Sequence, residues 1–193
     1  MKSRSGKEFR KTFLEILGKK TLDKITVSEI IEKSGYSRSS FYRNYEDYYD
    51  FVEKIIREEA EKLTCMLIDL MKHYRAEDSL DESILCDIMK HVYEEKVLYH
   101  MIFTAHNFIA SVSPMNFCLL VMNSFRDAGN FNFKGDISDI DEEFYRYAET
   151  LRFIRYLFYW DSHDYSFSPE YMAKQIVSMD KLDKAFEVME LQV

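Results

Sequence analysis

The stretch that decides the fold is residues 26–45, Thr-Val-Ser-Glu-Ile-Ile-Glu-Lys-Ser-Gly-Tyr-Ser-Arg-Ser-Ser-Phe-Tyr-Arg-Asn-Tyr. Its pattern predicts two short helices, over 27–34 and 38–44. Gly35 lies between them, where a residue without a Cβ atom permits the positive φ that a sharp turn requires. Two short helices joined by such a turn, with polar side chains on the second, are the layout of a helix-turn-helix DNA reader.

Hydroxyl side chains mark the starts of both helices. Thr26 or Ser28 can cap the first helix, and Ser37 can cap the second. In the second helix Phe41 is expected to face the core, so that the polar side chains around it face outward. The second helix is therefore the candidate recognition helix.

The rest of the chain also has helical patterns. The 193 residues include only 5 Gly and 2 Pro, which argues for long helices and against a sheet protein with many tight turns. We expect an all-α fold of about nine helices, with a three-helix DNA-binding domain at 1–46 and a larger domain for effector sensing and dimerisation at 47–193. Apolar spacing predicts the further helices at 7–18, 47–73, 82–95, 96–110, 113–128, 141–160 and 168–190. The segments 74–81 and 129–139 are expected to be loops.

Charge is divided unevenly along the chain. Residues 1–45 hold 11 Lys and Arg against 5 Asp and Glu, a net charge of +6, whereas residues 46–193 carry a net charge of −14. A basic segment is attracted to a polyanion, and an acidic one is repelled from it. The helix-turn-helix pattern lies in the basic segment, so two independent signals point to double-stranded DNA as a partner.

Other features narrow the class of protein. The three cysteines, Cys65, Cys86 and Cys118, are widely spaced and odd in number, as is typical of reduced thiols in a cytosolic protein. The first residues lack an apolar signal core, and no run of about 18 apolar residues predicts a membrane span. We therefore expect a cytoplasmic protein, without a cofactor.

Residues 9–51 resemble the tetracycline-repressor (TetR) family of transcriptional regulators. The resemblance is carried by the segment 30–51, Ile-Ile-Glu-Lys-Ser-Gly-Tyr-Ser-Arg-Ser-Ser-Phe-Tyr-Arg-Asn-Tyr-Glu-Asp-Tyr-Tyr-Asp-Phe. The shared features are the Gly-x-Ser turn at Gly35, the Phe41-Tyr42 pair and the aromatic residue at Tyr45. The family consists of all-α regulators whose body binds an effector, so the resemblance implies a DNA-binding repressor that an effector releases.

Three positions depart from the family pattern. Ile31 stands where the family usually has Ala, Asn44 replaces a common His, and Tyr48 replaces a Lys that often contacts a phosphate. A Tyr hydroxyl can still donate a hydrogen bond, but it carries no charge. This shifts the expected phosphate anchoring toward Lys19, Lys20, Arg38 and Arg43.

The expected DNA contacts divide into two groups. Arg38, Ser39 and Ser40 are predicted to reach base edges, because Arg bound to guanine through two hydrogen bonds is the commonest specific contact. Polar side chains around them are predicted to bind phosphates and fix the register of docking. This second group comprises Thr26, Ser28, Ser37, Tyr42, Arg43, Asn44 and Tyr48.

A single helix-turn-helix contacts only a half-site, so we expect a homodimer that spans two half-sites. The last two predicted helices carry more apolar positions than one buried face needs, and the resemblance implies that they form a four-helix bundle between two subunits. The predicted dimer residues are Tyr147, Leu151, Ile154, Phe158, Ile176, Met179, Leu182 and Phe186.

The middle of the chain is the expected sensor for a small apolar or aromatic effector. Met and aromatic residues suit adaptable apolar pockets. The candidate ligand residues are Tyr99, Phe103, His106, Phe117 and Phe125. The same spacing also suits an ordinary core, and a protein partner could control the body in place of a small ligand.

An enzyme is not expected. Asp87, His91 and Glu95 lie four residues apart on one predicted helix and could in principle bind a metal, but this spacing also describes an exposed charged stripe. No Gly-rich phosphate loop, HExxH, GxSxG or paired-Cys motif occurs.

Overall fold

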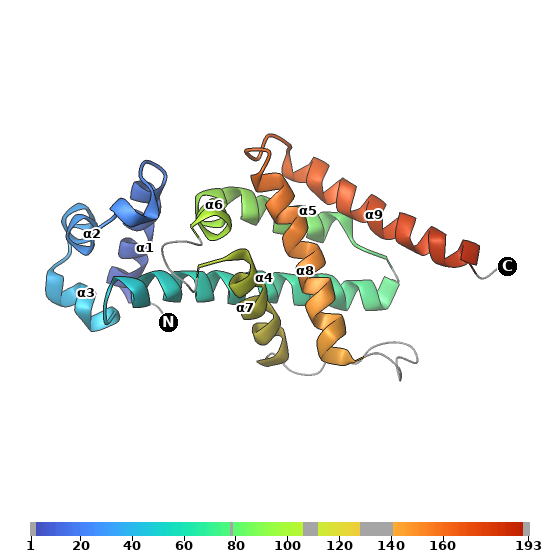
Figure 1. The fold of residues 1–193 in the computed structure, drawn as a ribbon, viewed down its shortest axis with the longest axis horizontal. Coiled ribbons are helices and arrows are strands. Elements are labelled where there is room, and N and C mark those ends of the chain that lie inside the picture. Colours follow the sequence, from blue (N-terminus) through green and yellow to red (C-terminus); the bar gives the residue numbers. More distant parts are fainter. Residues whose placement is uncertain (1–2, 78, 106–111, 128–140, 191–193) are drawn as a thin grey trace. The chain divides into compact units, whose positions relative to one another are not determined.

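The computed structural model describes residues 3–77, 79–105, 112–127 and 141–190 (Figure 1). Over these residues the chain has nine α-helices, one short 3-10 helix and no strand, which confirms the all-α prediction. The order is α1 (Arg4–Leu17), η1 (Leu22–Lys24), α2 (Val27–Ser34), α3 (Arg38–Asn44), α4 (Tyr48–Glu77), α5 (Glu82–Glu94), α6 (Lys96–Thr104), α7 (Pro114–Asp127), α8 (Glu142–Asp161) and α9 (Pro169–Glu190).

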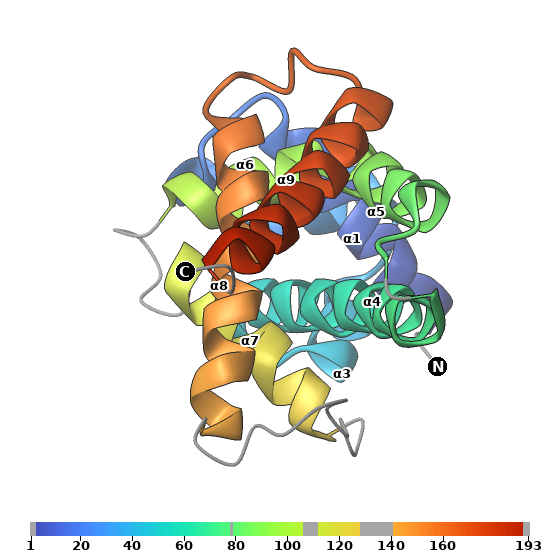
Figure 2. The same cartoon turned by 90° about the vertical axis from the view of Figure 1, so that its right-hand side faces the viewer.

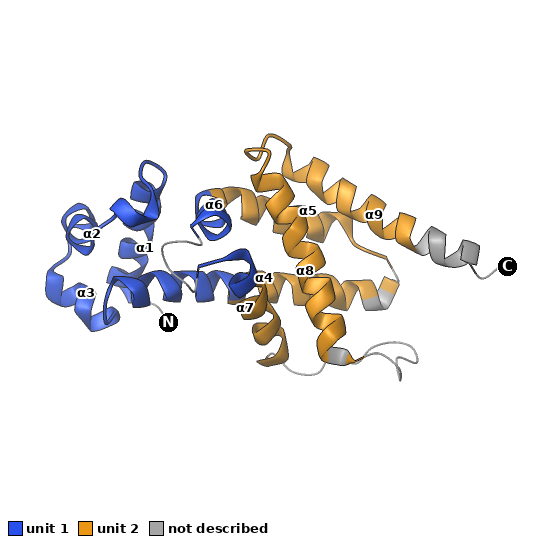
Figure 3. Cartoon of the chain, viewed as in Figure 1, with its two compact units in different colours: residues 1–60, 97–117 blue, residues 61–96, 118–193 orange. Residues whose placement is uncertain are grey.

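The chain divides into two compact units, which Figure 3 colours separately. The first unit comprises residues 1–60 and 97–117, and the second comprises residues 61–96 and 118–193. The first unit thus contains α1 to α3, the N-terminal part of α4 and most of α6. The predicted domains, 1–46 and 47–193, remain a prediction.

The helix-turn-helix in the first unit is built on an aromatic core. Phe9 of α1 and Phe41 of α3 are fully buried, with their ring centroids 5.3 Å apart. Tyr45 packs against Phe51 at 4.8 Å, and Phe51 packs against Phe13 at 5.3 Å, which holds α4 to α1. Edge-to-face aromatic pairs stabilise a core beyond the area they bury, so α3 is held firmly on α1 and α4.

In the second unit α5 and α9 lie against each other (Figures 1 and 2). Trp160 near the end of α8 is fully buried, stacks on Tyr93 of α5 at 5.8 Å and donates a hydrogen bond to the carbonyl oxygen of Phe167. The turn from α8 to α9 places Asp164 and Tyr165 at positive φ, a conformation that residues with a Cβ atom rarely adopt. The packing of Trp160 and Tyr165 at 5.2 Å holds this turn.

Three predicted boundaries were wrong. The helix predicted over 7–18 begins already at Arg4, because Ser3 caps it by accepting a hydrogen bond from the backbone N–H of Gly6. The helix predicted over 47–73 continues to Glu77, because the polar residues after His73 include no Gly or Pro to end it. The helix predicted over 96–110 ends at Thr104, whose hydroxyl donates to the carbonyl oxygen of His100 and so competes for the backbone of the last turn. No described helix is both long and apolar enough to span a membrane.

Candidate nucleic-acid interface

The turn between α2 and α3 has the geometry that the sequence predicts. Thr26 caps α2, with its hydroxyl oxygen accepting a hydrogen bond from the backbone N–H of Glu29. Gly35 follows α2 at φ +72°, in the left-handed region, and its N–H donates to the carbonyl oxygen of Glu32. A left-handed glycine directly after a helix is a common helix end, and here it reverses the chain into α3.

Three serine hydroxyls gather at the start of α3. Ser37 caps the helix by accepting from the N–H of Ser40, and its hydroxyl lies 2.9 Å from that of Ser39 and 3.0 Å from that of Ser40. Ser37 and Ser39 are exposed. Hydroxyl groups and backbone N–H groups at a helix N-terminus suit an anionic oxygen, so this end of α3 is suited to approach a phosphate backbone.

Arg38, the first residue of α3, is exposed and oriented by α2. Its guanidinium donates a 3.0 Å hydrogen bond to the hydroxyl of Ser28. Tyr42 and Arg43, one turn farther along, are exposed as well. These residues present donors that could reach base edges or phosphates.

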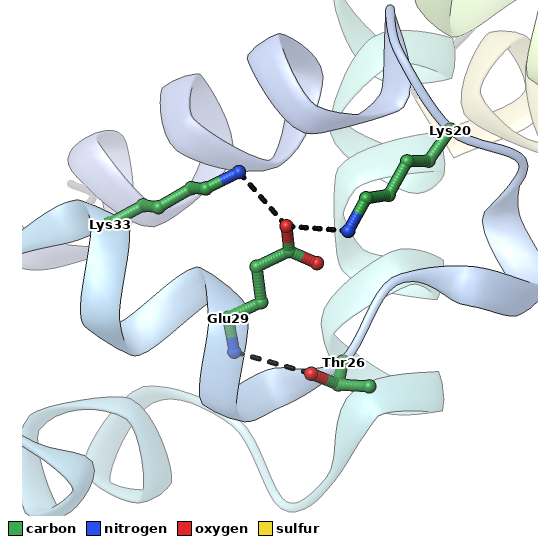
Figure 4. A network of polar contacts seen from close by, with 4 residues as sticks. All are labelled: Lys20, Thr26, Glu29 and Lys33. Atoms are coloured by element: carbon green, nitrogen blue, oxygen red, sulfur yellow. Dashed lines mark hydrogen bonds and ion pairs between the residues drawn. The ribbon is translucent and has the colours of Figure 1, made fainter.

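A polar network on α2 surrounds Glu29 (Figure 4). Its Oε1 atom accepts from Lys20 at 2.8 Å and from Lys33 at 2.9 Å. These two lysines lower the pKa of the Glu29 carboxyl below its ordinary value. Glu29 therefore neutralises part of the positive charge on this surface, and it holds two ammonium groups in place.

Asn44 attaches the end of α3 to the start of α1. Its side-chain N–H donates to the hydroxyl of Ser5 at 3.1 Å and to the carbonyl oxygen of Ser40 at 2.6 Å, and its oxygen accepts from Ser3 at 2.6 Å. These contacts use the polar atoms of Asn44 inside the protein. A contact with a phosphate would have to replace one of them.

Tyr48 is engaged in the same way. Its hydroxyl donates a 3.0 Å hydrogen bond to the carbonyl oxygen of Leu22, and burial raises the pKa of the phenol above its ordinary value. The residue that replaces the family's Lys thus ties the start of α4 to η1. It could reach a phosphate only after releasing Leu22.

The roles of Glu29, Lys33 and Ser3 were not predicted from the sequence. For Glu29 a signal was available, because Thr26-x-x-Glu29 is the spacing of a capping box, in which the acidic residue sits at the third helical position. Here only half of the box forms, and the carboxylate contacts lysines instead.

The predicted dimer residues differ in exposure. Phe158, Met179 and Leu182 are 47%, 43% and 48% exposed, whereas Ile154 and Ile176 are buried within the chain. Tyr147 and Leu151 are half-buried, and the side chain of Phe186 lies outside the described part of the structure. Three further large apolar side chains, outside the predicted set, are exposed on the same two helices, namely Phe144, Tyr159 and Tyr171.

The second unit contains a cavity of about 210 Å³. Its apolar lining comes mostly from α4, α5, α7 and α9 and includes Leu67, Leu70, Met71, Leu85, Phe125 and Ile176, together with Phe153 of α8. Its polar lining comes mostly from α8 and includes Tyr145, Arg146, Glu149, Thr150, Arg152 and Asp180. Arg152 is held by Glu149 at 2.7 Å and by Asp183 at 3.1 Å.

Of the four candidate ligand residues that the structure describes, one, Phe125, lines this cavity. Tyr99, Phe103 and Phe117 instead form a buried cluster in the first unit, with Tyr99 5.8 Å from Phe117 and 6.2 Å from Phe103. His106 lies outside the described residues.

The alternative metal site is not assembled. Among the described residues no group of three acidic, His or Cys side chains could hold a metal ion. His91 is buried, and its Nδ1 atom lies 3.1 Å from the ammonium of Lys62.

Comparison with known proteins agrees with the fold. No protein-family model matches the chain. An uncharacterised HTH-type transcriptional regulator, YxbF of Bacillus subtilis (strain 168), is 22% identical over 176 residues, which are 88% of this chain and 43% of that protein. The chain thus spans less than half the length of this curated relative.

Two solved structures share the fold. The dihydroxyacetone kinase operon activator DhaS superposes with a TM-score of 0.58 at 15% identity, covering 93% of this chain and 96% of that one. A TetR transcriptional regulator from Streptococcus agalactiae 2603V superposes with a TM-score of 0.52 at 19% identity, covering 92% and 93%. The chain has the TetR-like all-α fold, and these similar proteins are regulators rather than enzymes.

Proposed function

We propose that this protein is a dimeric, DNA-binding transcriptional regulator of TetR-like fold, most simply a repressor that an effector releases. The observation that carries the proposal is the start of α3, where Ser37, Arg38 and Ser39 are exposed around a capped helix end. This end belongs to the segment with a net charge of +6. A cytoplasmic location follows from this role.

In this proposal Arg38, Ser39 and Ser40 read base edges in the major groove. The residues around them, Thr26, Ser28, Ser37, Tyr42 and Arg43, position the helix on phosphates. Asn44 and Tyr48 contribute to DNA binding mainly by fixing α3 and α4 to their neighbours. Their polar atoms are already hydrogen-bonded within the unit.

A gel-shift titration with the DNA upstream of the protein's own gene tests the proposal. We expect binding at low micromolar protein or below, with an affinity that falls steeply as salt rises, because each phosphate contact releases condensed counterions. An unrelated duplex of equal length is the control. Equal binding to both duplexes, or no salt-sensitive binding to either, would contradict the proposal.

We infer that two copies pair through α8 and α9. The exposed side chains Phe158, Met179 and Leu182 support this, since exposed apolar patches commonly mark protein interfaces. Pairing would give the two helix-turn-helix elements that a two-fold symmetric DNA site requires.

We further infer that the effector binds in the cavity of the second unit. An engineered cavity of about 150 Å³ in another protein admits benzene, so a cavity of about 210 Å³ suits a small substituted ring. The polar residues of α8 could orient its substituent. The presence of a cavity favours this view over control by a protein partner.

The effector site can be tested without knowing the natural ligand. Phenol, indole and salicylate serve as probes, and binding is followed as a rise in melting temperature. Met71→Phe should narrow the cavity and reduce the rise, whereas Met66→Phe, on the same helix but outside the lining, should retain it. If no probe binds the wild-type protein, or if Met71→Phe binds as well as wild type, the cavity is not the site for compounds of this class.

The sign of regulation has its own test, because one of the two structural neighbours is named as an activator. Deletion of the gene distinguishes the two. Expression of the regulated gene rises if the protein is a repressor and falls if it is an activator.

A further inference from the structure

The charged side chains of the cavity wall show which kind of ligand it can accept. Arg152 of α8 belongs to the lining, and its guanidinium lies 2.7 Å from the carboxylate of Glu149 and 3.1 Å from that of Asp183 on α9. Asp180, also on α9, is a further lining residue. Burial disfavours a charged guanidinium, yet the pKa of Arg152 is raised, because these three carboxylates act on it. One guanidinium thus lies among three carboxylates, so the charge around it is negative on balance.

A ligand anion would compete with contacts that the protein already makes. Besides Arg152, the only cationic residue of the lining is Arg146, which has an interaction of its own within the chain. An anion that binds either guanidinium would have to share it with a carboxylate of the same sign, and like charges at close range repel. An ammonium group meets no such conflict. Each carboxylate offers about four lone-pair sites, so Glu149 can accept from an ammonium group and keep its contact with Arg152.

Aromatic rings are concentrated in the same lining. Five of the 16 lining residues are aromatic, compared with 16% of the whole chain. Three of the five come from α8, the helix that also supplies most of the charged wall; the full set is Tyr74, Phe125, Tyr145, Phe153 and Tyr156. Aromatic rings pack well against a ligand ring, and their π faces attract cations. Both properties suit a ligand that combines a ring with an ammonium group.

We propose that the cavity selects an aryl-alkyl ammonium ion, whose ring lies against the apolar wall and whose ammonium group binds the carboxylates of Glu149 and Asp180. The inference rests on the proposed effector site and names the chemical class of its ligand. The net charge of −14 on residues 46–193 acts in the same direction, because an acidic surface raises the local concentration of cations.

The selectivity should be moderate, because the charged side chains are only partly buried. The side chains of Glu149 and Asp183 are 38% and 48% exposed. Water and salt screen charges at such positions, so we expect a preference of about fivefold to tenfold for a cation over a neutral ligand of the same shape.

Three probes that share a phenyl ring and differ in the polar group test the inference by calorimetric titration of the full chain in low salt. At pH 7 phenethylamine is a cation, phenethyl alcohol is neutral and phenylacetate is an anion. We expect phenethylamine to bind at least about fivefold more tightly than the alcohol, and phenylacetate to bind more weakly than either. Alcohol or phenylacetate that binds as tightly as the amine would overturn the inference and leave the effector site in place.

Substitutions in the lining show whether the amine binds in the cavity. Met71→Phe narrows it and should weaken the binding of all three probes. Glu149→Gln and Asp180→Asn should each bring the Kd of the amine to within about twofold of that of the alcohol, because a carboxylate is lost while the shape is kept. The Kd of the alcohol, which reports on shape alone, should stay nearly unchanged in these two variants. If one of them does not fold, the other decides.

Glu143→Gln is the matched control. Glu143 lies on α8, is exposed and is not a lining residue, so its substitution changes the net charge by the same amount as Glu149→Gln. A preference for the amine that survives both lining substitutions, or that falls equally in Glu143→Gln, would overturn the inference, because the field of the whole body would then explain it. If none of the three probes binds, the inference and the proposed effector site fail together, whereas the gel shift still judges DNA binding independently.

Discussion

The guanidinium of Arg38 donates a hydrogen bond to the hydroxyl of Ser28, with 3.0 Å between the two heavy atoms. The two residues belong to different helices, α3 and α2, on either side of the Gly35 turn. This bond restrains a long, exposed side chain that would otherwise sample many rotamers. Restraint before binding reduces the entropy that is lost on binding.

The first prediction compares Arg38→Ala with Ser28→Ala. We expect Arg38→Ala to weaken specific binding by about 10- to 100-fold, since a good contact between Arg and guanine contributes about 1–3 kcal/mol of discrimination. Ser28→Ala should weaken it less, because the guanidinium remains but is no longer restrained. Competition titration against a selected duplex measures both. Unchanged sequence preference in Arg38→Ala would remove Arg38 from the set of base-reading residues.

The second prediction concerns the charge that Glu29 neutralises. In Glu29→Gln the ammonium groups of Lys20 and Lys33 lose their shared carboxylate, so they can turn toward phosphates. We expect tighter nonspecific DNA binding and a steeper salt dependence, by about one unit of slope for each new phosphate contact. Glu15→Gln, which removes a looser and more exposed pair with Lys11, is the control.

The pH dependence of Glu29 has a definite sign. Its pKa is lowered in the folded protein, so its contribution to stability is present above the unfolded-state pKa and is lost as pH falls through the folded-state pKa. The difference in melting temperature between wild type and Glu29→Gln should therefore shrink on acidification below the ordinary carboxyl range. A difference that stays constant through this range would show that the ion pairs do not contribute.

Local signals explain why α2 and α3 could be predicted to the residue. Thr26, Gly35 and Ser37 act within three or four residues of themselves, as caps or as a turn, so their effect is visible in the sequence. The end of α4 could not be predicted in the same way. The residues from His73 to Glu77 include no cap or turn residue that would mark where the helix ends.

The partners of candidate site residues were harder to predict, because they depend on contacts between distant segments. Asn44 resembles a phosphate-binding residue in the sequence, yet its amide contacts Ser3 and Ser5, about 40 positions away. The cavity is lined by residues of five helices, so no local pattern marks it. Apolar spacing alone did not separate Phe125, which lines the cavity, from Tyr99, which belongs to a buried cluster.

The third prediction uses two glycines that differ in conformation. Gly35 has φ +72° and nothing within 4 Å of an added Cβ, so Gly35→Ala is opposed by backbone strain alone. We expect it to lower the free energy of unfolding by about 1–2 kcal/mol, the usual penalty for a left-handed residue that has a Cβ atom. Gly18 has φ −66°, so Gly18→Ala should be neutral or slightly stabilising. Urea denaturation measures both, and equal effects would contradict the role assigned to Gly35.

The fourth prediction places a charge on the proposed dimer surface. Leu182 on α9 is 48% exposed in a single chain, and by two-fold symmetry Leu182→Asp would bury a carboxylate from each copy if this surface pairs. An unpaired buried charge is strongly destabilising, so light scattering should show twice the mass of a single chain for wild type and a shift toward the single-chain mass for the variant. Leu119→Asp is the control, because Leu119 is also an exposed leucine, at 37%, but lies on α7. A dimer that survives Leu182→Asp and dissociates in Leu119→Asp would move the interface to α7.

If the prediction holds, Leu182→Asp should also lose most of its affinity for a two-half-site duplex while keeping its weaker binding to a single half-site, because each helix-turn-helix remains intact.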